Sequence, residues 1–217
     1  MIARLPTLLV LLLAALPAPA WGGESIAVLE RRDLMIERGA TPPTHQLRLV
    51  LAYFKGAWAP EEIQTAARRG ARILGQCGVA IAQAELVLLD APARYREFST
   101  PVSRELARAL SLGKPTIYFV AGTRQQPAFD AEAIGRGNSG TRPELRDTVW
   151  VARGARELGI VLAHELVHVL MDSGEHTTQP GNLMREDTAP NNTVLSLAQC
   201  AQLRETATAN GLLRPVR

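Results

Sequence analysis

The chain has 217 residues, of which 24 are lysine or arginine and 21 are aspartate or glutamate, so its formal net charge is +3. This length suits one domain with small appendages. The nearly balanced charge, with arginines scattered along the chain, argues against nucleic acid or an anionic membrane as a partner. The long stretches alternate apolar and polar residues, as in a soluble domain, and we expect a monomer.

The first 20 residues have the pattern of a secretory signal peptide. Arg4 supplies a positive start, residues 8–16 form an apolar run, and Ala18-Pro19-Ala20 offers a cleavage site of small residues. The apolar run is too short to be a good membrane span. The sequence therefore predicts an exported protein, secreted or periplasmic, with no integral membrane segment in the mature chain.

The segment of residues 21–44 is charged and contains prolines, and it predicts a loosely attached lead before a domain that spans residues 45–217. Within that domain, residues 46–54 are rich in leucine, valine and aromatic residues, which favours a strand. A helix then opens at Pro60, because proline fits the first helical turn, and Gly78 offers its end.

The later elements continue to alternate between strand and helix. A second helix is predicted from Thr100 to Leu112, and the long connection that follows holds a candidate edge strand at residues 129–134. Ser196 and Gln199 form a capping box that opens a last helix. Further strands are predicted at residues 79–89, 116–121 and 148–152, and a further helix at residues 155–171. This order predicts an α/β (α+β) fold with helices on a twisted mixed sheet.

Cysteine usage also bears on the compartment. Only Cys77 and Cys200 are present, 123 positions apart. In an oxidising compartment an even pair predicts one disulfide, and the alternative is two separate buried thiols.

Three of the four histidines fall within 13 residues of one another. His164 and His168 are four positions apart, so they lie on one face of a helix and can both reach one metal ion. Glu165, one residue along, faces the open side and can act as a general base. Neutral imidazoles suit Zn²⁺, and a catalytic zinc keeps one coordination position open. The pattern therefore predicts one catalytic zinc ion.

The third protein ligand is open to more than one interpretation. His176 follows Gly174, where we expect the motif helix to have ended, and can turn back toward the first two histidines. Glu186 lies 18 residues after His168, a spacing that resembles thermolysin-like enzymes, and Asp172 lies one turn beyond His168. We favour His176 and expect the Asp172 carboxylate to cap or orient a neighbour.

The segment HELVHVLMDSGEHTTQPGNLM, residues 164–184, resembles the active-site stretch of the metzincin clan of zinc peptidases, nearest to matrixins. The resemblance implies a metzincin-like zincin fold, a third zinc ligand at His176 and a methionine turn at Met184 beneath the metal. It also implies a peptide substrate lying along a sheet-edge strand. The turn before His176 is two residues longer than the metzincin pattern, and Met171 stands where that pattern has glycine.

Together these features predict an exported zinc-dependent endopeptidase in which Glu165 activates water beside zinc held by His164, His168 and His176. One alternative is a catalytically inactive zinc-binding or interaction protein of the same fold. Glu165 argues against that alternative, because a structural zinc needs no base and would take a fourth protein ligand. A second alternative is hydrolysis of a non-peptide amide, which the residues leave open.

Overall fold

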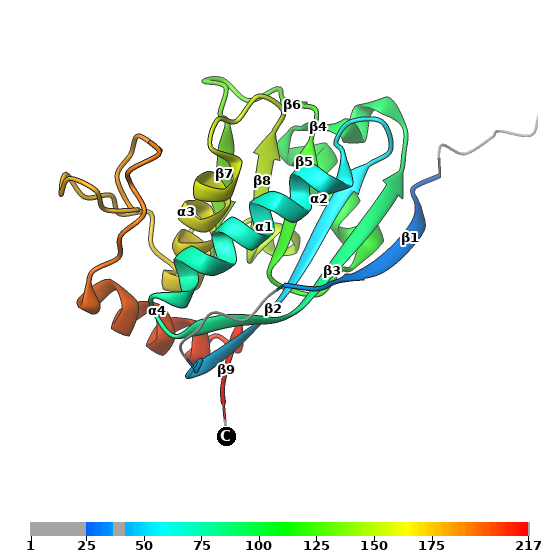
Figure 1. Ribbon diagram of the computed structural model, residues 1–217. Coiled ribbons are helices and arrows are strands. Elements are labelled where there is room, and N and C mark those ends of the chain that lie inside the picture. Colours follow the sequence, from blue (N-terminus) through cyan, green and yellow to red (C-terminus); the bar gives the residue numbers. More distant parts are fainter. Residues whose placement is uncertain (1–24, 37–41, 217) are drawn as a thin grey trace, which may run out of the picture.

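The computed structural model describes residues 25–36 and 42–216 (Figure 1). The predicted signal peptide, residues 1–20, lies outside the described residues. Among the helices that the structure does describe, none combines the length and the apolar character needed to cross a membrane.

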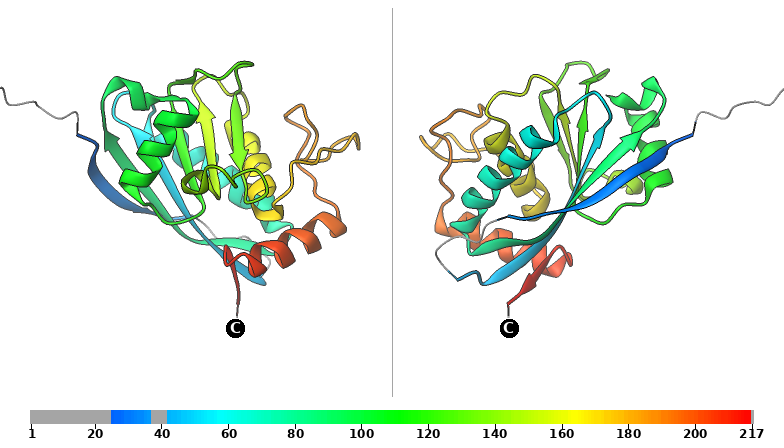
Figure 2. Two further views of the ribbon diagram at one scale, coloured as in Figure 1. Left: turned by 180° about the vertical axis from the view of Figure 1, so that it is seen from behind. Right: turned by 45° about the vertical axis from the view of Figure 1, so that its right-hand side comes forward.

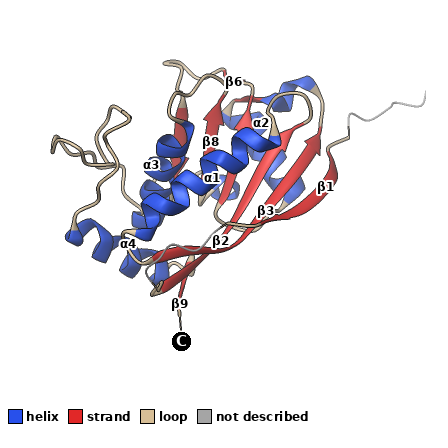
Figure 3. Cartoon of the chain, viewed as in Figure 1, coloured by secondary structure: helices blue, strands red, loops and turns tan. Residues whose placement is uncertain are grey.

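A twisted sheet of seven strands forms the centre of the molecule (Figures 1 and 3). Its order is β1-β3-β2-β5-β8-β7, with β9 paired to β2. The strands β2, β3, β5 and β8 run parallel to one another, whereas β1, β7 and β9 are antiparallel to their neighbours. The bounds are β1 Ala27–Leu34, β2 His45–Phe54, β3 Val79–Asp90, β5 Thr116–Val120, β7 Ala131–Ile134, β8 Thr148–Ala152 and β9 Leu213–Pro215.

Helices cover both faces of this sheet (Figure 2). The helices α1 (Pro60–Gly75) and α3 (Leu158–Met171) pack on one face, α2 (Thr100–Leu110) packs on the other, and α4 (Leu197–Ala209) lies against the end of α3. Short elements complete the chain: the 3-10 helices η1 (Ala93–Arg96) and η2 (Pro143–Leu145), and the paired strands β4 (Glu97–Phe98) and β6 (Gly122–Thr123).

The alternation of side chains along β2 explains the two faces. Leu47, Leu49 and Leu51 enter the core beneath α1 and α3, whereas Val50 and Ala52 enter the core beneath α2. Successive side chains of a strand point to opposite faces, so a strand covered on both faces is apolar at nearly every position. This pattern makes residues 46–54 recognisable as a strand from the sequence.

The N-terminal lead differs from the prediction, because residues 27–34 form β1 instead of a loosely attached segment. This strand pairs antiparallel with β3, and Arg31 forms an ion pair with Glu85 across the two strands at 3.0 Å. Most side chains of β1 are exposed. Such an edge strand is held mainly by backbone hydrogen bonds. Because it buries few side chains, its sequence shows little hydrophobic periodicity.

Three smaller differences concern the ends of two helices and one short strand. The helix α3 begins at Leu158 rather than residue 155, and α2 ends at Leu110, where Ser111 adopts a left-handed backbone with φ of 46°. Strand β9 was not predicted, because its three residues are too few for a periodic signal. The predicted edge strand is confirmed as β7.

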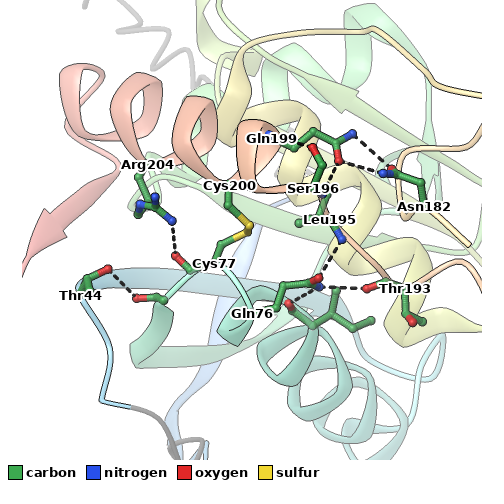
Figure 4. The surroundings of a disulfide bond; sticks show 12 residues. Thr44, Gln76, Cys77, Asn182, Thr193, Leu195, Ser196, Gln199, Cys200 and Arg204 are labelled. Carbon is green, nitrogen blue, oxygen red and sulfur yellow. Dashed lines mark hydrogen bonds between the residues drawn. A yellow bond between two sulfur atoms is a disulfide. The ribbon is translucent and has the colours of Figure 1, made fainter. Parts of the chain in front are cut away.

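A disulfide joins Cys77, just after α1, to Cys200 in α4 (Figure 4). Arg204 of α4 donates to the Cys77 carbonyl oxygen at 2.9 Å. The last helix is therefore tied both covalently and by a hydrogen bond to the end of the first helix.

Candidate metal centre

Helix α3 carries the first two histidines through the core. Eleven of its residues are buried, including His164 and His168, because the helix packs on the sheet and against α1 beside it. Gly159 allows the close approach of α1, since a Cβ at this position would lie 2.6 Å from the Arg69 Cβ. A helix that is apolar nearly all round is a buried helix, and two imidazoles in it require partners.

The helix ends at Met171, as the sequence predicted. Asp172 takes the left-handed conformation at the C-cap with φ of 48°, and Ser173 N donates to the His168 carbonyl oxygen at 3.1 Å. Aspartate adopts this conformation more readily than most residues do, so it replaces the usual glycine.

The Asp172 carboxylate is occupied by the loop after β7. Its Oδ1 accepts from the backbone N–H groups of Arg136 at 2.6 Å and Gly137 at 2.9 Å. This contact joins the end of α3 to the end of the edge strand. Asp172 thus orients a neighbouring loop, and it does not belong to the group of side chains that converge as possible metal ligands.

Three imidazoles converge beside the C-terminal half of the helix. The Nε2 atoms of His164 and His168 lie 2.9 Å apart, and the Nε2 atom of His176 lies 3.2 Å from each of them. His176 is exposed and comes from the segment that joins α3 to α4. In Figure 1 this segment, yellow to orange, projects away from the sheet beside α3.

The hydrogen bonds of the two helical histidines define their tautomers. His164 Nδ1 lies 2.7 Å from the Leu183 carbonyl oxygen, and His168 Nδ1 lies 2.7 Å from the Ser173 carbonyl oxygen. A carbonyl oxygen only accepts, so each Nδ1 carries a proton, and in a neutral ring the lone pair is then on Nε2. Burial lowers the pKa of His164, and it lowers the pKa of His168 to about 4, so both rings are neutral near pH 7.

This arrangement fits a tetrahedral metal ion. Ligand nitrogens around zinc, at bonds of about 2.0–2.1 Å, are separated by roughly 3.3 Å, and two of the three Nε2 pairs are 3.2 Å apart. Two unshared lone pairs 2.9 Å apart repel each other unless a cation or a proton lies between them. The three histidines can therefore hold a metal ion, and carbonyl partners on Nδ1 are the outer contacts that metal-binding histidines usually make.

Glu165 lines the same cleft, which has a volume of about 720 Å³. Burial raises the pKa of Glu165 to about 7, a hydrogen bond with the Ala133 backbone works against that rise, and the charge of Glu132 adds to it. Both neighbours belong to β7, which forms one wall of the cleft. A carboxylate that exchanges its proton near pH 7 is suited to general acid–base chemistry.

The remaining predicted residues lie close by in different roles. Glu186 is exposed and lines the cleft, but it is outside the converging histidine group. Met184 is 2% exposed and belongs to the main core, and its carbonyl oxygen accepts from Thr177 N at 2.8 Å, next to His176. The turn at Met184 therefore supports the segment that presents the third histidine.

Sequence reasoning missed a set of amides behind the site. Asn182 is 3% exposed and exchanges two hydrogen bonds with the side chain of Gln199. Gln76 binds the same segment further along, at Thr193 and Leu195 (Figure 4). The capping-box pattern identified Gln199 as a helix residue, but no local pattern pairs it with Asn182, 17 positions away.

The fold and the site together define a mixed α/β protein with a three-histidine group able to hold a metal ion. Among solved structures, the chain is similar to metalloproteinase-II from Bacteroides fragilis, with a TM-score of 0.57 and 17% sequence identity. The match covers 80% of this chain and 56% of that one, so the chain spans little more than half the length of that protein. No protein-family model and no curated protein sequence matches the chain. At this level of identity the similarity shows the fold.

Proposed function

We propose that the chain is a zinc-dependent endopeptidase. The observation that carries the proposal is the convergence of the three Nε2 atoms of His164, His168 and His176 in the cleft that also holds Glu165. Three histidines leave one position of a tetrahedral ion free, which is the arrangement of a catalytic rather than a structural zinc. The resemblance of residues 164–184 to metzincins and the metalloproteinase fold support the same conclusion.

Zinc held by the three imidazoles would polarise the scissile carbonyl. The Glu165 carboxylate accepts a proton from the attacking water and later passes it to the leaving amine. The carbonyl oxygens of Leu183 and Ser173 hold the His164 and His168 rings with their Nε2 atoms directed at the ion. The Met184 turn supports the third ligand from below.

The substrate is a peptide that lies along β7. This strand pairs with β8 on one side, is last in the strand order of the described sheet, and forms a wall of the cleft. An extended peptide can add to such an edge through backbone hydrogen bonds, which places its carbonyl groups beside the metal. The protein acts as a monomer after export, and the disulfide suits an oxidising compartment.

The test compares the wild type with Glu165→Gln and His176→Ala. Bound zinc and hydrolysis of a mixture of unstructured peptides are measured for each protein. Glu165→Gln should bind zinc normally and lose hydrolysis by about 10²–10⁴-fold, because the base is absent. His176→Ala should lose most of its zinc affinity. Glu186→Gln is the matched control, since it removes a carboxylate from the same cleft and should keep its zinc.

Each of the following outcomes would decide one part of the proposal: the third ligand, the general base or the peptidase activity. Full zinc retention by His176→Ala, with loss of zinc from Glu186→Gln, would assign the third ligand to Glu186. Unchanged hydrolysis in Glu165→Gln would refute the proposed base. A wild type that binds zinc tightly and hydrolyses no peptide would indicate a zinc-binding protein without peptidase activity.

A further inference from the structure

His164 and His168 are each oriented by a backbone carbonyl group, but the two carbonyl groups lie at very different distances along the chain. The partner of His168 is the Ser173 carbonyl, five residues further along and held at the end of the same helix. The partner of His164 is the Leu183 carbonyl, 19 residues away in the segment between α3 and α4. The orientation of His164 therefore depends on how that distant segment is fixed.

The peptide group between Leu183 and Met184 is held at its N–H, on the side opposite to the carbonyl oxygen that faces His164. Met184 N donates to the Asn182 Oδ1 at 2.8 Å, while the Leu183 oxygen faces His164 Nδ1 at 2.7 Å. In a planar trans peptide the N–H and the C=O point in opposite directions, so an acceptor that holds the N–H also sets the direction of the C=O. Leu183 N adds a bond to the Val194 oxygen at 2.7 Å.

Gln199 in turn determines the orientation of the Asn182 amide. Asn182 Nδ2 donates to Gln199 Oε1 at 2.9 Å, and Gln199 Nε2 donates back to Asn182 Oδ1 at 3.2 Å. The other end of the pair is held by Ser196 N, which donates to Gln199 Oε1 at 2.8 Å. Because both backbone N–H groups are donors only, neither amide can flip without placing an NH₂ against an N–H.

The neighbouring disulfide holds Gln199 in place. Gln199 precedes Cys200, which is bonded to Cys77 after α1 (Figure 4). The amide pair thus stands on a helix that is tied to the main body of the fold. A continuous series of contacts runs from that helix through Asn182 and the Leu183 peptide to the His164 ring.

We propose that Asn182 and Gln199 are positioning residues for the metal centre, which orient His164 through the peptide group between Leu183 and Met184. This inference rests on the proposed zinc site, but it assigns a role to residues outside that site. Outer contacts of this kind typically change metal affinity by about 10–100-fold when they are removed. This role also explains why a buried amide, hydrogen-bonded at both Nδ2 and Oδ1, lies next to Leu183.

The experiment measures Zn²⁺ affinity by competition with a chelator and the visible spectrum of the Co²⁺-loaded protein. Asn182→Leu keeps the side-chain size and should weaken Zn²⁺ binding about 10–100-fold and shift the Co²⁺ absorption bands. Gln199→Leu, on a partly exposed helix position, should produce a smaller change in the same direction. It also provides the test if Asn182→Leu does not fold.

Gln76→Met is the matched control. It removes hydrogen bonds to Thr193 and Leu195 of the same segment, but Gln76 makes no hydrogen bond to Asn182 or to the peptide group between Leu183 and Met184. It should lower thermal stability while changing Zn²⁺ affinity less than threefold and leaving the Co²⁺ spectrum unchanged.

The proposal is overturned if the leucine variants keep wild-type affinity and spectrum. It is also overturned if Gln76→Met loses as much affinity as Asn182→Leu, because general loosening of the segment would then suffice. Failure of the proposed zinc site gives a different result, since the wild type itself would then bind neither Zn²⁺ nor Co²⁺. Failure of the peptidase activity alone would show as a wild type that binds zinc but hydrolyses no peptide, and it would leave the affinity comparison intact.

Discussion

The disulfide offers the most direct test of how the C-terminal helix is held. The double variant Cys77→Ala/Cys200→Ala removes the bond between two cysteines that are 1% and 4% exposed. The substitution leaves the hydrogen bond from Arg204 and the packing of Leu203 and Ala207 in place. The change therefore acts mainly on the unfolded chain.

The magnitude follows from the length of the loop. A crosslink between positions 123 residues apart restricts the unfolded chain, and the chain-entropy model gives an upper bound of about 5 kcal/mol in the free energy of unfolding. Measured losses for native disulfides are about 2–5 kcal/mol. For a domain of this size each kcal/mol moves the midpoint of thermal unfolding by roughly 2–4 °C. We expect the midpoint to fall by about 5–15 °C.

The assay is equilibrium unfolding in guanidinium chloride, followed by tryptophan fluorescence, to which the fully buried Trp150 contributes. A chelator is present throughout, so that metal binding adds nothing to the measured stability. The double variant should unfold at lower denaturant concentration with a slightly steeper transition, because its unfolded state is more expanded. The reduced wild type should behave like the variant. An unchanged midpoint in both would refute the reasoning.

Three further predictions concern the surroundings of α3. In metal-free protein the pKa of Glu165 is raised from 4.5 to about 7, so the folded state holds its proton more tightly. The free energy of unfolding should therefore fall as the pH rises from about 4.5 to 7. Urea titrations of Glu165→Gln should not show this pH-dependent loss. Gly159→Ala should lower the free energy of unfolding by about 1–3 kcal/mol, because the added Cβ clashes with Arg69. Gly75→Ala should be neutral or stabilising, because no atom lies near its Cβ. Equal thermal midpoints for the two variants would contradict this prediction. Asp172→Gly should lower the free energy of unfolding by about 1–3 kcal/mol, because two hydrogen bonds to backbone N–H groups are lost. Asp172→Ala should lower it by about 1 kcal/mol more, because alanine disfavours φ of 48°. The reverse order of the two variants in chemical denaturation would refute the capping role.

Features with a local cause were accessible from the sequence. The i, i+4 spacing places His164 and His168 on one face of any helix, whatever surrounds it. The capping box of Ser196 and Gln199 is likewise a contact over three residues, and the structure contains it. The apolar run of residues 46–54 predicts a buried strand, because both faces of β2 are covered.

Features that depend on distant neighbours were not accessible in the same way. The middle of β1, residues 30–33, is charged, and only the pairing with β3 makes this segment part of the sheet. The Asp172 carboxylate accepts hydrogen bonds from the backbone of Gly137 and Arg136, 35 and 36 residues earlier in the chain. A local pattern has no information about such partners.

The sequence by itself determined two imidazoles and a carboxylate on one helix, a nearby third histidine and a single possible disulfide pairing. Only the tertiary structure decided that the His176 ring meets the other two and that Asn182 and Gln199 stand behind His164. The physical reason is the range of the interactions. Helical spacing follows from the backbone alone, whereas the convergence of three rings needs a loop held in place by hydrogen bonds to other elements.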